Sequence, residues 1–479
     1  MHNNKQETVE QAFHGPLGHP VDNTVEQAFH GPLGEPVENT LEQASDGPLG
    51  DAVENDVSRA ISRLNYWLET MRTPQGYGGP ISHWWDSCLV YAGAMLDWRY
   101  EGIVCGYLNL YRTTGESAWL DKAVCAADDL CRGQWPDGHF WNSSFEFGPA
   151  ICGTPHEAAV DVALLEVAST LREEGAPEWE TYLAAAQRHV EEVLIARLWN
   201  GHGFKEQPHH NWLVANKNAT TLEALLLYQR LTNVPMQRYI KGAAQVVLNA
   251  QVLDGIRTGA TIHIGTHQHQ LTIGIYTARC VSTLARLMAL QPRVEYERFL
   301  ARAVYYLGRL IDSESTLFGH YRNGQPIAAP QWISPSGDLL RALLLARKYV
   351  DVPEEWITRL IEILLNAQHP TGAIPTAKGF AQLGSQRGKT TARPDFRDVL
   401  PVTGWCDKAF YALTLLPESA SSRVDARGMP TELRCQWQGR KCRYYEYDSE
   451  ISLFDFDKNQ MLYFWHKGDS YPTCMNLWL

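Results

Sequence analysis

Residues Leu108 to Ala123 read LNLYRTTGESAWLDKA: an apolar helix end, a tight polar turn with Gly, and a new helix that opens near an aromatic residue. The pattern returns at Leu225 to Ile240 as LLLYQRLTNVPMQRYI, and at Ala342 to Trp356 as ALLLARKYVDVPEEW. Gly and Pro are residues that end one helix and open the next. Recurrence of such a helical hairpin is typical of a helical repeat fold or a closed helical ring.

Between these hairpins run longer connections rich in Trp, His, Gly and Pro. Apolar periodicity predicts an inner set of more apolar helices near residues 98–113, 156–173, 217–232, 270–290, 335–350 and 405–416. It predicts an outer set near 57–71, 116–132, 178–198, 235–251, 293–311 and 353–367. Six pairs predict an all-α (α/α)6 barrel over residues 56–428, although the segment 84–96 is also compatible with a helix. All the long loops would then lie on one face, where we expect the function.

The first 55 residues differ from the rest of the chain. A 16-residue unit occurs three times, as TVEQAFHGPLGHPVDN, TVEQAFHGPLGEPVEN and TLEQASDGPLGDAVEN, starting at Thr8, Thr24 and Thr40. Each unit has one short apolar patch and a Gly-Pro break, too little to bury a core, so we predict a mostly disordered tail. The repeats are either an inert linker or a multivalent docking tag for a protein partner.

Residues 429–479 change character again. Short aromatic and β-branched runs alternate with turns at Gln438-Gly439 and at Asp457. This pattern predicts a small β-rich appendage of two to four strands.

The bulk composition excludes several classes of partner. The chain has 479 residues and a net charge of −12, which disfavours nucleic acid and anionic membranes. It has no apolar run of about 18 residues that could span a membrane. The ten cysteines include no CxxC pair, so a structural zinc site is not expected, and several stand singly in apolar helical text. With no secretory signal visible, these features predict a cytoplasmic protein.

Two phrases carry a resemblance: QWPDGHFW at Gln134 to Trp141 and NAQHPTGAIP at Asn366 to Pro375. Together with the repeated hairpins, they make residues 56–416 resemble the six-hairpin toroid enzymes. That broad class includes glycoside hydrolases, uronate lyases and epimerases, terpene cyclases and protein prenyltransferases, and no single family is assigned. The DxDD motif of class II terpene cyclases and the Cys-His pair of lanthionine cyclases are both absent.

Polar residues cluster where the long loops meet the inner helices, whose positive N-terminal ends favour anions. Glycoside hydrolysis needs two carboxyl groups, and Glu101 and Glu157 are the first pair proposed, with Asp338 and Asp407 as rivals. A first-turn carboxylate can also simply compensate the helix dipole. Histidines add bases, so the predicted catalytic residues are Glu157, Glu101, Asp338, Asp407, His156 and His210.

A second group of loop residues is predicted to bind substrate, through indole stacking on sugar rings and through hydrogen bonds. It comprises Asp97, Tyr100, Trp141, Trp212, Asn216, Asn218, His263, His267, His269, Tyr321, Arg322, Trp332 and Trp405. The three histidines at spacings of four and two lack a nearby acidic ligand motif, so hydrogen bonding to substrate is favoured over metal binding.

These observations predict a carbohydrate-active enzyme that acts on a glycan or uronate by hydrolysis or by lyase or epimerase chemistry. Its partner would be a small-molecule or oligosaccharide substrate, with no metal or cofactor. The first alternative is a terpene or peptide cyclase, which an apolar barrel lining would favour. The second is a non-catalytic helical scaffold with a docking tail, which carboxylates deep in the barrel would argue against.

Overall fold

A computed structural model describes residues 51–82, 89–92, 96–140, 153–262, 272–311, 320–322, 325–327, 331–369, 372–378, 403–416, 431–437, 440–447, 449–469 and 472–475. Among them, six helices make up the inner set: α3 (Arg99–Thr114), α5 (Ala158–Glu173), α7 (Ala215–Thr232), α9 (Gly274–Leu290), α11 (Ser336–Ala346) and α14 (Thr403–Leu413). The outer set is α2 (Asp51–Thr70), α4 (Ser117–Gly133), α6 (Trp179–Arg188) with its π-helical continuation η3 (His189–Leu198), α8 (Gln237–Asn249), α10 (Val294–Gly308) and α12 (Glu354–Ala367). Residues 1–50 of the predicted tail lie outside the described residues. Its last five residues, 51–55, belong to α2 and are helical, not part of a disordered tail.

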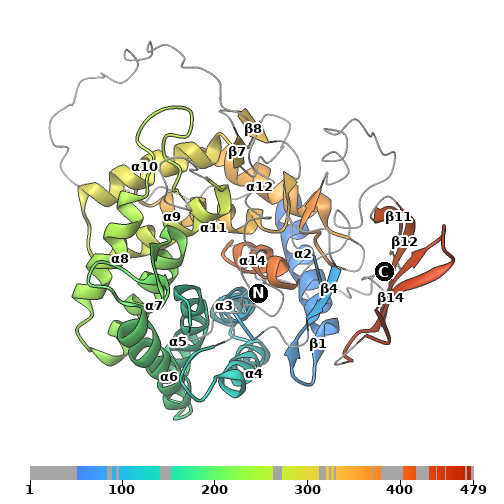
Figure 1. Cartoon of the computed structure of the whole chain (residues 1–479), viewed down its shortest axis with the longest axis horizontal. Coiled ribbons are helices and arrows are strands. Elements are labelled where there is room, and N and C mark those ends of the chain that lie inside the picture. Colours follow the sequence, from blue (N-terminus) through green and yellow to red (C-terminus); the bar gives the residue numbers. More distant parts are fainter. Residues whose placement is uncertain are drawn as a thin grey trace, which may run out of the picture. The chain divides into compact units, whose positions relative to one another are not determined.

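The inner helices form a closed ring (Figure 1). Helix α3 packs against α5, α5 against α7, α7 against α9, α9 against α11, α11 against α14, and α14 against α3. Each outer helix packs mainly on one inner helix, and α2 covers α14, so the first described helix of the chain closes the last hairpin. Helix α5 buries 14 of its 16 residues, whereas α4 buries five of 17. The predicted division into inner and outer helices is confirmed.

The hairpin turns follow from single residues that accept a left-handed backbone. Gly115 ends α3 at φ 71°, and its amide donates to the carbonyl of Tyr111. Asn233 ends α7 in the same way at φ 58°, with its amide bonded to Gln229. Only Gly, and less often Asn, adopts this conformation at low cost, so both helices stop at these positions.

Three outer helices end in the same structural device, which we call the glutamine staple. Its glutamine donates from Nε2 both to a glycine carbonyl in the following loop and to a backbone carbonyl of the next outer helix. The staples are Gln134 with Gly138 and Ala185, Gln251 with Gly259 and Phe299, and Gln368 with Gly372 and Ala60. They tie α4 to α6, α8 to α10, and α12 to α2. Two of the staples lie in the sequence phrases on which the resemblance to the toroid enzymes rests, at QWPDG and QHPTG.

The glycine in each staple is required by geometry. Gly259 and Gly372 have φ of 94° and 91°. A Cβ on either would lie 2.0 Å from a backbone carbonyl oxygen, of Arg302 and Arg63 respectively. The loop therefore passes so close to the neighbouring outer helix that only glycine fits.

Short antiparallel pairs of strands lie in the loops. They pair β1 (Arg72–Thr73) with β2 (Gly76–Tyr77), β3 (Gly79–Ser82) with β4 (Leu89–Ala92), β5 (Lys205–Gln207) with β6 (His210–Leu213), β7 (His320–Arg322) with β8 (Gln325–Ile327), and β9 (Gln331–Trp332) with β10 (Ala377–Lys378). Strand β4 shows that residues 89–92, for which a helix was also considered, are extended. Helix α2 likewise begins at Asp51, before the predicted start at residue 57.

The C-terminal appendage is an antiparallel meander of five strands within the described residues, one more than the upper expectation. The strands are β11 (Thr431–Trp437), β12 (Arg440–Glu446), β13 (Glu450–Asp455), β14 (Gln460–His466) and β15 (Cys474–Met475), paired in that order. One face is anchored on α2, because Trp67 Nε1 donates to Glu446 Oε1 at 3.0 Å. Lys467 and Tyr444 also bind this buried carboxylate.

No helix in the described part of the chain has both the length and the apolar character needed to cross a membrane.

Candidate functional site

Charged and aromatic side chains gather where the inner helices begin. Every inner helix, or the segment just before it, contributes. The residues are Trp98, Arg99 and Glu101 at α3, His156 in the short helix η2 (Pro155–Glu157) before α5, Lys217 on α7, Arg279 on α9, Asp338 on α11, and Asp407 and Lys408 on α14. We call this group the ring-end cluster.

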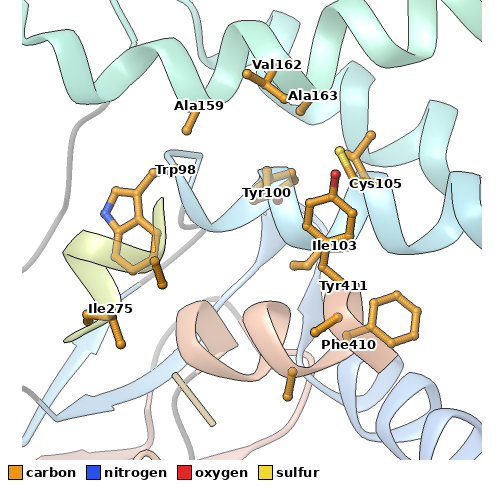
Figure 2. Close-up of a cluster of buried hydrophobic side chains, with 14 of the residues drawn as sticks. Trp98, Tyr100, Ile103, Cys105, Ala159, Val162, Ala163, Ile275, Phe410 and Tyr411 are labelled. Carbon is orange, nitrogen blue, oxygen red and sulfur yellow. The ribbon is translucent and has the colours of Figure 1, made fainter. Parts of the chain in front are cut away.

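Trp98 is the centre of the ring-end cluster. Its indole stacks on the His156 ring at 5.5 Å between centroids, with 21° between the planes. The Arg99 guanidinium lies 4.5 Å from the indole centroid, and Lys408 Nζ lies 5.0 Å from it. Figure 2 shows the indole extending toward Ile275 in the first turn of α9. Trp98 thus joins residues from α3, η2, α9 and α14, and its ring faces attract cations.

The surroundings of His156 favour its neutral form. Burial lowers its pKa well below the usual value, and the positive charges of Lys217, Lys408, Arg279 and Arg99 lower it further. A neutral imidazole keeps one ring nitrogen free of a proton, so it can accept one from a substrate.

Two carboxyl groups of the ring-end cluster have a raised pKa, the opposite of the lowered pKa of His156. Burial raises the pKa of Asp338, against the opposing charge of Lys408. Burial also raises the pKa of Asp407 well above its usual range, although Lys408 Nζ lies 3.0 Å from Asp407 Oδ2. Asp407 is fully buried, whereas Asp338 is partly exposed. Burial therefore favours the protonated form of Asp338, and its partial exposure leaves it open to a ligand.

Glu101, also predicted as catalytic, is a fixed anion. Its burial would raise the pKa, but Arg279, Arg341 and Lys408 outweigh that effect and lower the pKa to about 2. Its carboxylate accepts hydrogen bonds from Arg279 and from Arg341. A carboxylate held this way is a poor proton donor and instead orients Arg279.

Glu101 belongs to a network of buried ion pairs inside the ring. Glu223 on α7 binds Arg341 at 2.7 Å, Arg279 at 3.0 Å and Arg286 at 3.1 Å. Arg286 also donates hydrogen bonds to Glu166 on α5 and to the hydroxyl of Tyr411 on α14. Each inner helix therefore supplies at least one polar side chain, and the opposite charges satisfy one another away from water.

Three predicted residues instead hold loops in place. Glu157 Oε2 accepts the amide of Phe140 at 2.8 Å, and its Oε1 accepts that of Thr154 at 3.1 Å. Asn218 binds both the amide and the carbonyl of Phe204. The Tyr100 hydroxyl accepts the amide of Tyr77. All three are buried, and each fixes the loop that precedes its inner helix.

The remaining predicted residues lie in several places. His210 and Trp212 stack on each other at 5.2 Å on the exposed hairpin β5–β6, where Trp212 is 62% exposed. Asp97 pairs with Arg99 next to the cluster, and Asn216 and Trp332 are buried. Tyr321 and Arg322 belong to β7, and Trp405 to the first turn of α14. Trp141, His263, His267 and His269 lie outside the described residues.

Sequence reasoning missed Trp98, Arg99, Lys217, Arg279, Arg341 and Lys408. A usable signal existed for the arginines: a charge inside an otherwise apolar helix implies a buried partner. The described residues contain no group of three His, Cys, Asp or Glu side chains arranged to hold a metal ion.

No protein-family model matches the chain, and no curated protein matches it. Solved structures do. A cellobiose 2-epimerase from Spirochaeta thermophila has a TM-score of 0.57 and 13% identity, covering 77% of this chain and 98% of that one. An unsaturated glucuronyl hydrolase from Bacillus sp. GL1 has a TM-score of 0.53 and 15% identity, covering 75% and 96%.

A third structure, an unsaturated glucuronyl hydrolase specific for heparin, has a TM-score of 0.53 and 13% identity, covering 76% of this chain and 96% of that one. Identities this low relate the chains by fold alone. The ring of helical hairpins therefore places this chain among proteins with the (α/α)6 toroid fold, without assigning it to one family.

Proposed function

We propose that this protein is a carbohydrate-active enzyme whose reaction takes place at the ring-end cluster. One observation carries the proposal: Asp338, with a raised pKa, lies in the same cluster as His156, whose pKa is lowered. Burial favours the neutral form of each group, which is the protonated carboxyl of Asp338 and the unprotonated imidazole of His156. The first form can donate a proton and the second can accept one. The known substrates of the fold relatives, a disaccharide and glucuronyl sugars by their names, support the same substrate class.

Asp338 is the proposed proton donor, and His156 the proposed proton acceptor. Hydrolysis needs a donor to the leaving oxygen and a base that activates water. Lyase or epimerase chemistry needs a base next to a carbonyl or carboxylate, and a cation that stabilises the resulting negative charge. Arg279 and Lys408 supply that cation, so the cluster suits a sugar that carries a carboxylate.

The polar character of the cluster argues against a cyclase, which needs a mostly apolar lining. Carboxyl groups buried at the ring end, with pKa values raised by burial, argue against a scaffold without catalytic function.

Purified full-length protein should convert at least one member of a set of oligosaccharides that end in either a uronate or a neutral sugar. The variant Asp338→Asn should lose at least a hundredfold in kcat while keeping its melting temperature. Asp351→Asn, at an exposed position in the turn between α11 and α12, is the matched control and should behave like the wild type. Equal turnover by Asp338→Asn would remove Asp338 from the mechanism.

A further inference from the structure

The outward face of the C-terminal sheet carries an unusual set of aromatic side chains. Along β12, Cys442, Tyr444 and Glu446 are buried, whereas the alternating residues are partly or fully exposed. This alternation assigns one face to the helical ring and the other to solvent. The aromatic residues on the outward face or just beyond its strands are Tyr445, Tyr447, Phe454, Phe456, Phe464 and His466. Tyr447 is 38% exposed and Phe456 is 45% exposed.

These rings surround a small residue. Ser452 on β13 lies directly between Tyr445 on β12 and Phe464 on β14 in the strand register. Tyr445 is parallel to Tyr447, with 8° between the planes and 6.5 Å between centroids. Phe464 contacts His466 edge to face at 4.8 Å. The face therefore offers flat apolar rings on both sides of a short central side chain.

A cationic corner adjoins these rings. Arg434 on β11 and Arg443 on β12 are directly opposite each other, and Lys441 shares the outward side of β12. Like charges directly opposite in a sheet repel each other, and an anionic ligand bound beside them would reduce that repulsion. The Arg443 guanidinium lies 4.6 Å from the Phe456 ring centroid and donates to the Tyr445 hydroxyl at 3.3 Å. The cation is thus held in place beside the aromatic rings.

We propose that this aromatic face binds an acidic polysaccharide, at a site separate from the ring-end cluster. Sugar rings stack on aromatic faces, and guanidinium groups bind carboxylates with two parallel hydrogen bonds. A polysaccharide is chosen over a polynucleotide because the inference rests on the proposed function, in which the protein acts on a carbohydrate.

The position of the sheet suggests what such binding achieves. The opposite face is fixed to α2 through the buried contact of Trp67 with Glu446. A polymer held on the outward face would stay attached to the same compact unit as the ring, which raises its local concentration there.

Affinity electrophoresis of the full-length protein through gels that contain polygalacturonate, alginate or hyaluronan tests the proposal. At least one acidic polymer should retard the protein, amylose should not, and retardation should weaken as sodium chloride rises. The double variant Tyr445→Ala/Phe464→Ala should bind at least tenfold more weakly. Arg434→Gln/Arg443→Gln should lose the preference for acidic over neutral polymers.

Lys458→Gln, at the exposed turn between β13 and β14, is the matched control and should bind like the wild type. Asp338→Asn should also bind like the wild type, and the sheet variants should keep full activity on a short soluble substrate. If no acidic polymer retards the protein, if the sheet variants are retarded equally, or if polyuridylate gels retard it more strongly, the inference is wrong. Retention without conversion of any glycan would instead overturn only the proposed function.

Discussion

The imidazole of His156 stacks on the indole of Trp98, although the two residues come from different hairpins of the ring. This contact fixes the plane of the imidazole, while burial and the surrounding cations favour its neutral form. The base of the proposed reaction is therefore oriented by an aromatic ring and tuned by charge.

The first prediction concerns pH. Activity should fall at low pH, when His156 becomes protonated, and at high pH, when Asp338 loses its proton. The charge of Lys408 lowers the pKa of both groups, so Lys408→Met should move both limbs of the kcat profile to higher pH. Lys348→Met, at an exposed position after α11, should leave the profile in place. If the kcat profile of Lys408→Met falls at the same pH values as that of the wild type, Lys408 does not influence the catalytic pair.

A second prediction separates loop support from chemistry. Because Glu157 accepts two backbone amides in a buried setting, Glu157→Gln should destabilise the protein by about 1–3 kcal/mol. The kcat of the folded variant should stay close to that of the wild type. Thermal melting and single-turnover rates, compared with those of Asp338→Asn, measure the two effects. A large loss of kcat at an unchanged melting temperature would instead support the catalytic role expected from sequence.

The third prediction concerns acid stability. The pKa of Glu101 is about 2, below its usual 4.5, so its ion pairs stabilise the fold above pH 4.5. That contribution is lost as the pH falls from 4.5 toward 2. Glu101→Gln should lower the unfolding free energy by about 3–5 kcal/mol at pH 7, because buried arginines lose a partner. Urea unfolding at pH 7 and pH 3 should show the difference shrinking in acid. Glu295→Gln, an exposed control on α10, should show no such trend.

The glutamine staples give a fourth prediction. Gln368→Ala removes two hydrogen bonds to backbone carbonyls and should lower stability by about 1–2 kcal/mol. The same change at Gln134 should add to it, because the two staples lie on different pairs of outer helices. Gln187→Ala, on the exposed side of α6, is the control. Chemical denaturation of the three single variants and the double variant decides whether the staples act independently.

The fifth prediction concerns the N-terminal repeats, which we propose as a docking tag. Removing residues 1–50 keeps α2 whole from Asp51, so the melting temperature and the activity should not change. Recruitment to a multivalent protein partner should fall steeply as the repeats are deleted one by one. Identical cellular distribution of the full-length and shortened proteins would favour an inert linker.

Local chemistry explains what the sequence predicted well. Gly115 and Asn233 end helices through their own backbone preferences, and the apolar content of α5 marks it as an inner helix whatever it packs against. The order of helices, their pairing into hairpins and the β-rich C-terminus therefore follow from neighbouring residues alone. The strand count of the appendage was underestimated because β15 is only two residues long.

The direction in which a polar side chain turns at the start of a helix was decided only by the tertiary structure. Glu157 and Asp338 are both acids next to inner-helix N-termini, yet one binds backbone amides of a loop and the other stays partly exposed in the ring-end cluster. Arg279 meets Glu101 across 178 residues of sequence. The sequence by itself determined where helices begin, end and bury an apolar face, since these depend on local preferences. Which charges meet, and hence which carboxyl can carry a proton, depends on burial and distance that exist only once the ring has closed.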